Sequence, residues 1–302
     1  MIQKSKDQIC QFFSSKNQAN KNQNSNDETL KKKIEERAFI FKKNKNDKDF
    51  QVLQEVYTEA YKSKQIDDCY KRFIKSIGSN SQLFNYYSIK QLQEKHKLLK
   101  LCSKYREVRG DGNCFYTALG YRFLQILLCE YNLEEFIFFL DKIEEIDLPF
   151  KVYCKQITIP EEIQKNLLNE FLSRLCEIRL IEDKNERLDN LMEQYSAYET
   201  KDNIDGYFFA LTTIFFRNIS YYVATKSEMA ESITDINNLL IWGEECNNNE
   251  IVIKELSEFL RVMIVLVFVN NGTISSIEYS GELHYHQILL LFQPGHYNIG
   301  FE

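Results

Sequence analysis

One long apolar segment constrains the fold of this chain more than any other feature. It runs from Phe115 to Leu128 and is apolar on nearly every face that a helix would present. A helix without a polar side is buried in the protein interior, because water would otherwise meet its apolar side chains. We therefore expect a central helix that the rest of the chain encloses.

Glycine, aspartate and asparagine crowd the turn ahead of this segment, in the sequence Gly110-Asp111-Gly112-Asn113-Cys114. Aspartate is a favoured N-cap, so we expect the Asp111 carboxylate to accept a hydrogen bond from the backbone N–H of Asn113 or Cys114. Cys114 then lies in the first helical turn, where free N–H groups and the positive end of the helix dipole face its sulfur. These groups favour a thiolate and can hold the oxyanion of a tetrahedral intermediate.

A second motif lies in a predicted hairpin. The apolar run over residues 288–292 ends at a Pro-Gly turn, and residues 297–301 have the pattern of the returning strand. Side chains alternate across a strand, so His296 and Asn298 point to the same face. The Asn298 amide oxygen can then accept a hydrogen bond from one ring nitrogen of His296, which leaves the other nitrogen for a thiol. Cys-His-Asn sites of this kind occur in papain-like proteases.

Each motif also has a simpler interpretation. A cysteine before an apolar helix is usually a small buried hydrophobe, and a histidine after Pro-Gly is usually a surface turn residue. The combination favours catalysis, because few other histidines could serve as the base. The chain has four: His96, His284, His286 and His296.

The remaining pattern predicts an α+β fold. Helical periodicity dominates residues 50–105 and 133–227, and residues 262–269 form a β-branched run typical of a buried strand. These segments indicate a small, mostly antiparallel sheet of about five strands covered by helices, with the helix after Cys114 packed through the middle. The other expected strands lie near residues 105–108, 273–279, 288–292 and 297–301.

The two motifs carry a family resemblance. Residues 111–116 together with residues 294–297 resemble the otubain branch of the ovarian-tumour (OTU) cysteine deubiquitinases. Residues 92–108 are similar to the helix and lead-in strand of that family, and residues 242–269 to the segment ahead of its last hairpin. The resemblance spans roughly residues 50–302 and implies the papain-like OTU cysteine protease fold.

The resemblance also implies a role for each site residue. Cys114 would be the nucleophile, His296 the general base and acid, and Asn298 the residue that orients His296. Asp111 would organise the oxyanion loop. Thr117 stands at a position where otubains usually carry arginine. This difference affects a local salt bridge or a substrate contact and does not affect the nucleophile.

The implied activity is that of a deubiquitinase. It would hydrolyse the isopeptide bond after the C-terminal glycine of ubiquitin without a cofactor, and its partners would be ubiquitin and polyubiquitin chains. The alternative is a non-catalytic regulator that binds ubiquitin or a ubiquitin-conjugating enzyme and blocks chain synthesis by occupancy. The intact Cys114, His296 and Asn298 favour hydrolysis and leave this second function open.

Charge divides the chain into two parts. Residues 1–49 hold 12 Lys and Arg against 7 Asp and Glu, whereas the remainder holds 26 against 37. The polar Lys-, Asn- and Gln-rich beginning predicts a disordered tail over residues 1–48. The catalytic domain, with a helical N-terminal part, is then expected over residues 49–302.

An acidic catalytic region suits a basic substrate segment. The ubiquitin tail that the resemblance implies carries arginines before its terminal diglycine. Runs of acidic residues are more often a solvated helix face than a binding site. The preferred candidates for contacting that tail are Trp242, Glu244 and Glu245.

Two weaker signals have simpler interpretations. Ile9, Phe12 and Phe13 have the spacing of peptides that dock on DNA sliding clamps, but Lys6 stands where such peptides usually carry glutamine, so we favour a chance apolar cluster that anchors the tail. His284 and His286 face one side of a predicted strand, but no carboxylate or cysteine pair completes a tetrahedral metal site, so we expect no metal.

Several partner classes are not expected. No motif indicates binding of nucleotides or nucleic acids. The two best apolar runs are interrupted by Arg122 and Arg217, and the first residues lack an apolar leader, so we expect no membrane partner. The 8 cysteines show no short paired spacing and are expected to be reduced thiols. Together these features predict a cytoplasmic protein, with the nucleus as a second location.

Overall fold

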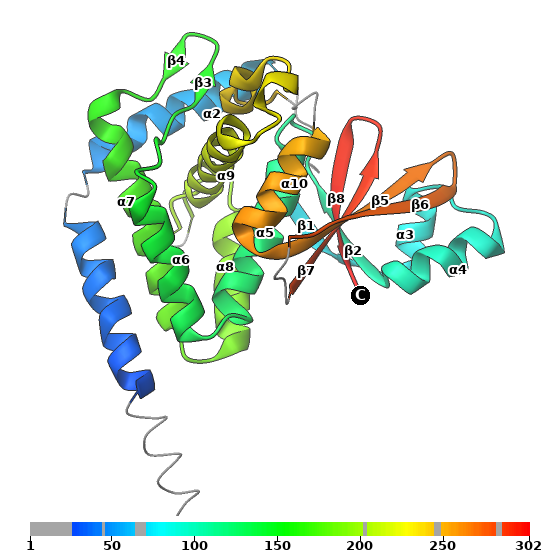
Figure 1. Cartoon of the computed structure of the whole chain (residues 1–302), viewed down its shortest axis with the longest axis horizontal. Coiled ribbons are helices and arrows are strands. Elements are labelled where there is room, and N and C mark those ends of the chain that lie inside the picture. The colour runs from blue at the N-terminus through cyan, green and yellow to red at the C-terminus, as the bar shows by residue number, and fades with distance from the viewer. Residues whose placement is uncertain (1–25, 44–45, 64–70, 202–203, 245–248, 282–285) are drawn as a thin grey trace, which may run out of the picture.

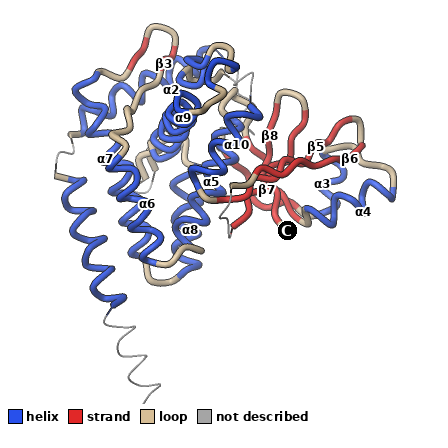
Figure 2. The backbone as a smooth tube through the Cα atoms, in the orientation of Figure 1, coloured by secondary structure: helices blue, strands red, loops and turns tan. Residues whose placement is uncertain are grey.

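The computed structural model describes residues 26–43, 46–63, 71–201, 204–244, 249–281 and 286–302. In this part of the chain a bundle of helices lies beside a twisted sheet (Figure 1; Figure 2). The helices are one over residues 26–42, α2 (Gln51–Ser63), α3 (Asn80–Tyr86), α4 (Leu92–Leu101), α5 (Cys114–Cys129), α6 (Leu133–Glu145), α7 (Glu161–Leu180), α8 (Lys184–Ser196), α9 (Phe208–Lys226) and α10 (Asn249–Leu260). The 3-10 helices are η1 (Asp47–Phe50), η3 (Ala230–Ser232) and η4 (Ile236–Leu240).

The main sheet has 6 strands in the order β1-β2-β8-β7-β5-β6. Neighbouring strands are antiparallel except β5 and β7, which are parallel. The predicted α+β class with a small, mostly antiparallel sheet is therefore confirmed. The strands are β1 (Ile74–Gly78), β2 (Lys104–Val108), β5 (Val262–Asn270), β6 (Thr273–Tyr279), β7 (His286–Gln293) and β8 (His296–Phe301), and a separate pair is formed by β3 (Tyr153–Cys154) and β4 (Ile157–Thr158).

Strand β1 is the member of the main sheet that the sequence pattern missed. Its sequence Ile-Lys-Ser-Ile-Gly buries only Ile74 fully, so it lacks the alternation by which a half-buried strand is identified. Pairing with β2 at the edge of the sheet determines its conformation, and Ile74 lies opposite Val108 there. Tertiary contact thus overrides a weak local signal.

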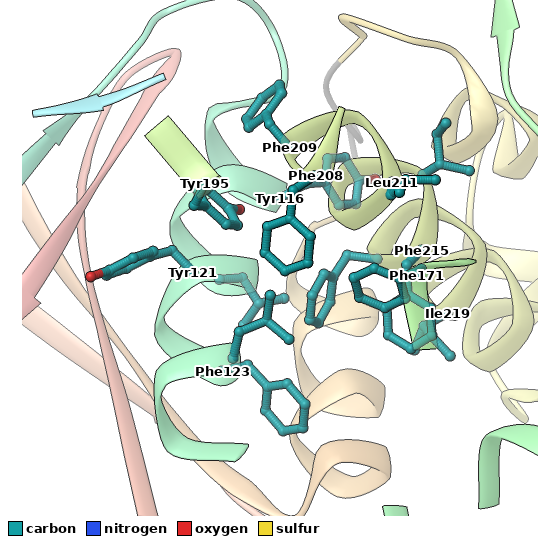
Figure 3. Packing of buried hydrophobic residues seen from close by; sticks show 14 of the residues in the cluster. Tyr116, Tyr121, Phe123, Phe171, Tyr195, Phe208, Phe209, Leu211, Phe215 and Ile219 are labelled. Atoms are coloured by element: carbon teal, nitrogen blue, oxygen red, sulfur yellow. The ribbon is translucent and has the colours of Figure 1, made fainter. Parts of the chain in front are cut away.

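Helix α5 lies at the centre of the molecule, as its sequence predicts. Every residue of α5 except Arg122 and Gln125 is buried. Gly120 allows close contact with α9, because a Cβ atom there would lie 2.9 Å from the ring of Phe216. Figure 3 shows aromatic side chains of α5 packed among those of neighbouring helices, with Tyr116, Tyr121 and Phe123 from α5, Phe171 from α7, Tyr195 from α8, and Phe208 and Phe215 from α9.

Strand β8 carries the second motif into the middle of the sheet. It pairs with β2 on one side and with β7 on the other (Figure 1). Helix α5 packs against this strand near its N-terminal end, where the rings of Phe115 and Tyr297 lie 5.2 Å apart. The fold therefore brings the turn before α5 and the start of β8 to the same corner of the molecule.

The structure corrects the extent of the expected disordered tail. Residues 26–42, which we expected to be disordered, form a helix that buries Leu30, Ile34 and Phe41. Ile34 follows Leu30 by four residues and Phe41 follows Ile34 by seven, so the three side chains share one helical face. Arg37 pairs with Asp141 of α6, and Lys42 contacts Glu177 of α7 at 2.6 Å. The polar composition concealed this amphipathic pattern, and residues 1–25, which contain Ile9, Phe12 and Phe13, lie outside the described residues.

In the described part of the chain, none of the helices combines the length and the apolar character that crossing a membrane requires.

Candidate active site

Helix α5 begins at Cys114, which therefore lies in the first helical turn as expected from the sequence, and the Cys114 side chain is buried. The turn before it is closed by Asp111, whose Oδ1 accepts a hydrogen bond from the Asn113 backbone nitrogen at 2.9 Å. The helix cap itself is Asn113 and not Asp111 as we expected, because the Asp111 turn closes one residue before the helix starts. Cys114 nevertheless occupies the first helical position, where its N–H has no acceptor within the helix.

The Asp111 carboxylate also has a buried cationic partner. Its Oδ2 accepts hydrogen bonds from Arg109 Nε at 3.1 Å and Nη2 at 2.8 Å. Arg109 donates a further hydrogen bond to the Lys71 carbonyl oxygen at 3.0 Å, and its guanidinium lies 4.1 Å from the centre of the Phe73 ring. Both carboxylate oxygens are thus bound, which holds the turn before Cys114 rigidly against the segment that leads into β1.

A close contact between two glycines joins this turn to a second loop. Gly112 has a φ of +80°, and a Cβ atom there would lie 1.8 Å from the Gly243 carbonyl oxygen. A glycine is required here both for the backbone conformation and for space. The loop over residues 110–113 therefore packs directly on the loop that follows η4.

Asn113 connects the same two loops through its side chain, which is fully buried. Its Oδ1 accepts hydrogen bonds from Gly243 N at 3.1 Å and from Arg217 Nη2 at 2.7 Å and Nε at 3.2 Å. Because donors converge on this atom, the orientation of the amide is fixed. The residue immediately before the cysteine is thus held by a buried arginine of α9.

His296 and Asn298 share one face of β8, as the two-residue period of a strand predicts. His296 Nε2 lies 3.1 Å from Asn298 Oδ1, so the expected hydrogen bond is present. Asn298 is fully buried, and its Oδ1 also accepts a hydrogen bond from the Val108 backbone nitrogen at 2.8 Å. Its Nδ2 donates to the Tyr87 hydroxyl at 2.8 Å.

These contacts determine which ring nitrogen of His296 carries the proton. The atom of Asn298 that faces the Val108 N–H must be the carbonyl oxygen, so His296 Nε2 must donate to it. The lone pair of a neutral imidazole then lies on Nδ1. That nitrogen points toward the turn before α5, because a Cβ atom built on Gly110 would lie 3.7 Å from it. The imidazole can therefore accept a proton on the side that faces the cysteine turn.

Burial lowers the pKa of His296 below its ordinary value. The hydrogen bond to Asn298 and the negative charges of Glu107 and Asp111 act in the opposite direction but are smaller effects. A lowered pKa keeps the imidazole neutral near pH 7, which is the state that a general base requires.

Three residues were singled out as substrate contacts, and the structure places two of them beside the turn. Trp242 is 8% exposed and its indole packs edge-on against Tyr57 and Phe209, so most of it belongs to the core. Glu244 is exposed. Both line a cavity of about 270 Å³ that also includes Asp111. Glu245 lies outside the described residues, and the role of all three stays a prediction.

The histidine pair that we weighed as a metal site is only partly described. His286 begins β7, where its Nδ1 lies 3.1 Å from Glu130 Oε2 and its ring contacts Tyr131. His284 lies outside the described residues. Within the described ranges, no group of three His, Cys, Asp or Glu side chains is arranged to hold a metal ion.

Four residues of this region were missed by sequence reasoning. Tyr87, Arg109 and Asn113 gave no signal, because each has a partner that lies far away in the sequence. Arg217 did give a signal, because an arginine inside the apolar helix α9 must find buried acceptors or be destabilising.

The otubain family, Peptidase C65, matches residues 72–301. The ubiquitin thioesterase OTUB2 of Mus musculus is 25% identical over 208 residues, which cover 67% of this chain and 83% of that protein. The ubiquitin thioesterase OTUB2 of Homo sapiens is 26% identical over 213 residues, with the same two coverages of 67% and 83%.

Solved structures show the same fold. One contains h/ceOTUB1 with ubiquitin aldehyde and UBC13~Ub, with a TM-score of 0.50, 17% identity, and coverage of 82% of this chain and 94% of that one. Another contains ceOTUB1 with ubiquitin aldehyde and UBC13~Ub, with a TM-score of 0.50, 18% identity, and coverage of 82% and 98%. A third has UBCH5B~Ub in place of UBC13~Ub, again with a TM-score of 0.50 and 17% identity, and coverage of 82% and 94%.

Proposed function

This chain belongs to the otubain family of cysteine peptidases, and from that premise we propose that Cys114, His296 and Asn298 are the catalytic triad of a ubiquitin-specific thiol peptidase. The observation that carries the proposal is the hydrogen bond from His296 Nε2 to Asn298 Oδ1, which leaves Nδ1 facing the turn before Cys114. The related ubiquitin thioesterases support ubiquitin as the molecule that is released.

In the first step, the Cys114 thiol gives its proton to His296 Nδ1 and the sulfur attacks the carbonyl carbon of the terminal ubiquitin glycine. A tetrahedral intermediate forms, and its negative oxygen is held by backbone N–H groups at the start of α5. Asn298 accepts the hydrogen bond from Nε2–H throughout, so the ring keeps its orientation while it becomes an imidazolium. The rigid turn held by Asp111 keeps those N–H groups in place.

The intermediate then collapses and the bond between the glycine carbonyl carbon and the lysine nitrogen breaks. His296 Nδ1 returns its proton to the leaving amine, which departs as the free lysine side chain. A water molecule next gives a proton to Nδ1 and attacks the thioester. The bond between the carbonyl carbon and the Cys114 sulfur breaks, and the sulfur takes the proton from Nδ1. Ubiquitin leaves with its C-terminal carboxyl group, which gives its remaining proton to solvent and becomes a carboxylate. Neither a metal ion nor a nucleotide takes part in these steps.

Glu244 is our proposed contact for the basic residues of the ubiquitin tail. It is exposed and lines the cavity that includes Asp111 of the turn before Cys114, so we expect a substrate segment that reaches Cys114 to pass close to it. Trp242 supports this loop from within the core, through Tyr57 and Phe209. We include Glu245, which follows Glu244 in sequence, in the same proposal.

A ubiquitin with a C-terminal electrophile tests the catalytic proposal. Incubated under reducing conditions, the protein is expected to form a one-to-one covalent adduct at Cys114, identified by peptide mass spectrometry. Cys114→Ala should form none, whereas the matched variant Cys129→Ala, which removes a thiol at the far end of α5, should react as the natural protein does. Absence of the adduct, or an adduct at another cysteine, would falsify the proposal.

A second function is favoured by the solved structures, which contain UBC13~Ub or UBCH5B~Ub bound to otubains. We propose that this chain also binds a ubiquitin-charged conjugating enzyme and slows chain synthesis by occupancy. Cys114→Ala separates the two functions in a chain-synthesis reaction that uses such an enzyme. Slower synthesis with this variant supports occupancy, and synthesis at the uninhibited rate leaves hydrolysis as the only function.

A further inference from the structure

Arg217 is a fully buried cation whose hydrogen bonds all go to neutral oxygens. Besides Asn113 Oδ1, it donates to three carbonyl oxygens: Leu239 at 3.0 Å, Glu244 at 3.0 Å and Gly112 at 3.4 Å. No carboxylate of the described residues forms an ion pair with it. A buried charge without a counter-ion is costly, and an apolar side chain of similar volume would usually be more stable at such a position. Packing alone therefore does not explain this arginine.

The contacts of Arg217 lie on both sides of the cysteine in sequence. Gly112 and Asn113 immediately precede Cys114, and the Tyr116 ring, two residues after it, lies 4.2 Å from the guanidinium carbon. The carbonyl contacts at residues 239 and 244 lie at the end of η4 and in the loop that follows it. One guanidinium thus fastens both loops together at the start of α5, through the planar set of donors that only arginine has.

Arg217 is also coupled electrostatically to the site. Burial lowers its pKa, whereas Tyr116, Asp111, Glu244 and Cys114 act to raise it. Such coupling is mutual. If the negative charge of a group stabilises protonated Arg217, the positive charge of Arg217 stabilises the charged form of that group. Arginine keeps its proton even in buried positions. The fold thus holds a permanent positive charge behind the cysteine turn.

We propose that Arg217 is a positioning residue for the nucleophile: it clamps residues 112–113 to the loop over residues 239–244 and supplies a buried positive charge that stabilises the Cys114 thiolate. The charge acts through the protein interior, and Arg217 does not touch the substrate. This inference rests on the proposed role of Cys114 as the nucleophile, but the charge effect can be measured without ubiquitin.

The pH dependence of Cys114 alkylation by a small neutral reagent, followed by peptide mass spectrometry, tests the charge. In Arg217→Met, the midpoint pH of alkylation should move upward by about one unit, which reduces the thiolate fraction near neutral pH roughly tenfold. Arg217→Lys keeps an ionisable amine at the site and should move the midpoint less than Arg217→Met, since burial lowers the pKa of a lysine without removing its charge at acidic and neutral pH. Other thiols do not obscure the result, because peptide mass spectrometry assigns alkylation to each cysteine separately. Burial also raises the pKa of Cys102 to about 11 and that of Cys176 to about 12.

Arg174→Met is the matched structural control. Arg174 is a buried arginine of α7 whose partners are Glu170 and Asp205, so its loss perturbs the core without touching the cysteine turn. It should lower the denaturation midpoint and leave the alkylation midpoint unchanged. If Arg217→Met fails to fold, Arg217→Gln provides the same neutral comparison with some of the hydrogen bonds kept.

Turnover of a ubiquitin substrate tests the clamp. For Arg217→Met we expect kcat to fall about tenfold or more with KM little changed, since the damage lies at the transition state. For Arg217→Lys, kcat should fall less than for Arg217→Met. A folded neutral variant with the natural alkylation midpoint and natural kcat overturns the inference. If instead the alkylation midpoint moves while Cys114 never reacts with the ubiquitin electrophile, the inference about charge holds and the proposed function fails.

Discussion

The hydroxyl of Tyr87 accepts a hydrogen bond of 2.8 Å from the amide nitrogen of Asn298. Tyr87 follows α3, far from β8 in sequence, and it is buried. Together with the Val108 N–H on the opposite side of the amide, it leaves Asn298 only one orientation. The tautomer of His296 therefore follows from the orientation of Asn298, which the Val108 N–H fixes and the Tyr87 hydroxyl supports from the other end of the amide.

Tyr87→Phe should weaken this arrangement without changing its shape. The Asn298 amide nitrogen would lose its buried acceptor, which costs about 1–3 kcal/mol of unfolding free energy, and kcat should fall because His296 is held less firmly. Urea denaturation and ubiquitin-substrate kinetics measure the two effects. Tyr279→Phe is the control, since the Tyr279 hydroxyl is buried without a hydrogen-bond partner in the described structure and its removal should be nearly neutral.

The pH profile should reflect the buried imidazole. Because burial lowers the pKa of His296, the acid limb of kcat/KM is expected below the ordinary value of 6.5. In Asn298→Asp a carboxylate would face Nε2–H and favour the imidazolium, so the acid limb should move to higher pH. An acid limb at the same pH in both proteins would show that the titrating group is not His296.

The same lowered pKa has a consequence for stability. Between the ordinary pKa of 6.5 and the lower value in the folded protein, the unfolded chain binds the His296 proton more readily. Stability should therefore fall as the pH drops through this window. His296→Gln should reduce that part of the pH dependence of the unfolding free energy, measured by urea titrations from pH 7 downward. An unchanged slope would contradict the assignment.

Gly112→Ala should be far more damaging than an alanine at another left-handed glycine. At Gly112 the new Cβ would lie 1.8 Å from the Gly243 carbonyl oxygen, whereas at Gly295, with a similar φ of +78°, nothing lies within 4 Å. Gly295→Ala should cost only the backbone strain of about 1–2 kcal/mol. Denaturation midpoints of the two variants compare these costs. Equal midpoints would mean that the two loops separate easily.

Glu244→Lys tests the proposed contact with the basic ubiquitin tail. We expect KM for a ubiquitin substrate to rise several-fold with kcat nearly unchanged, and the effect to shrink as salt is added, because exposed charges are screened. Glu278→Lys makes the same charge change on an exposed face of the edge strand β6 and should leave KM as it is. An equal rise in both variants would point to net charge rather than to a contact.

The features predicted correctly from the sequence are local ones. The place of Cys114 in the first turn of α5 follows from a cluster of turn residues ahead of an apolar run, and the shared face of His296 and Asn298 follows from the period of a strand. Each depends on a few consecutive residues. The hairpin also follows from one local turn, and it places β8 next to β7.

The features that were missed depend on partners distant in sequence. Arg109 binds the Lys71 carbonyl oxygen, Arg217 binds Asn113, and Tyr87 binds Asn298, and no periodic pattern records such pairs. The helix over residues 26–42 was missed for a related reason. Its apolar face is narrow, and most of its residues are polar because they face water. Composition averages over the faces of a helix and so hides a narrow one.

The position of β8 between β2 and β7 determines the order in which the parts of the proposed site can come together. The cysteine helix and β2 are made early, but the strand that carries His296 and Asn298 comes last of the described elements and inserts in the middle of the sheet. Until it does, β2 and β7 each present an unpaired edge, and His296 and Asn298 are not yet beside the cysteine turn. On the proposed assignment of the triad, a chain without β8 is inert toward substrate, and its open strand edges make it prone to associate. The proposed hydrolysis then becomes available only once the sheet is complete, which couples activity to the completion of the fold.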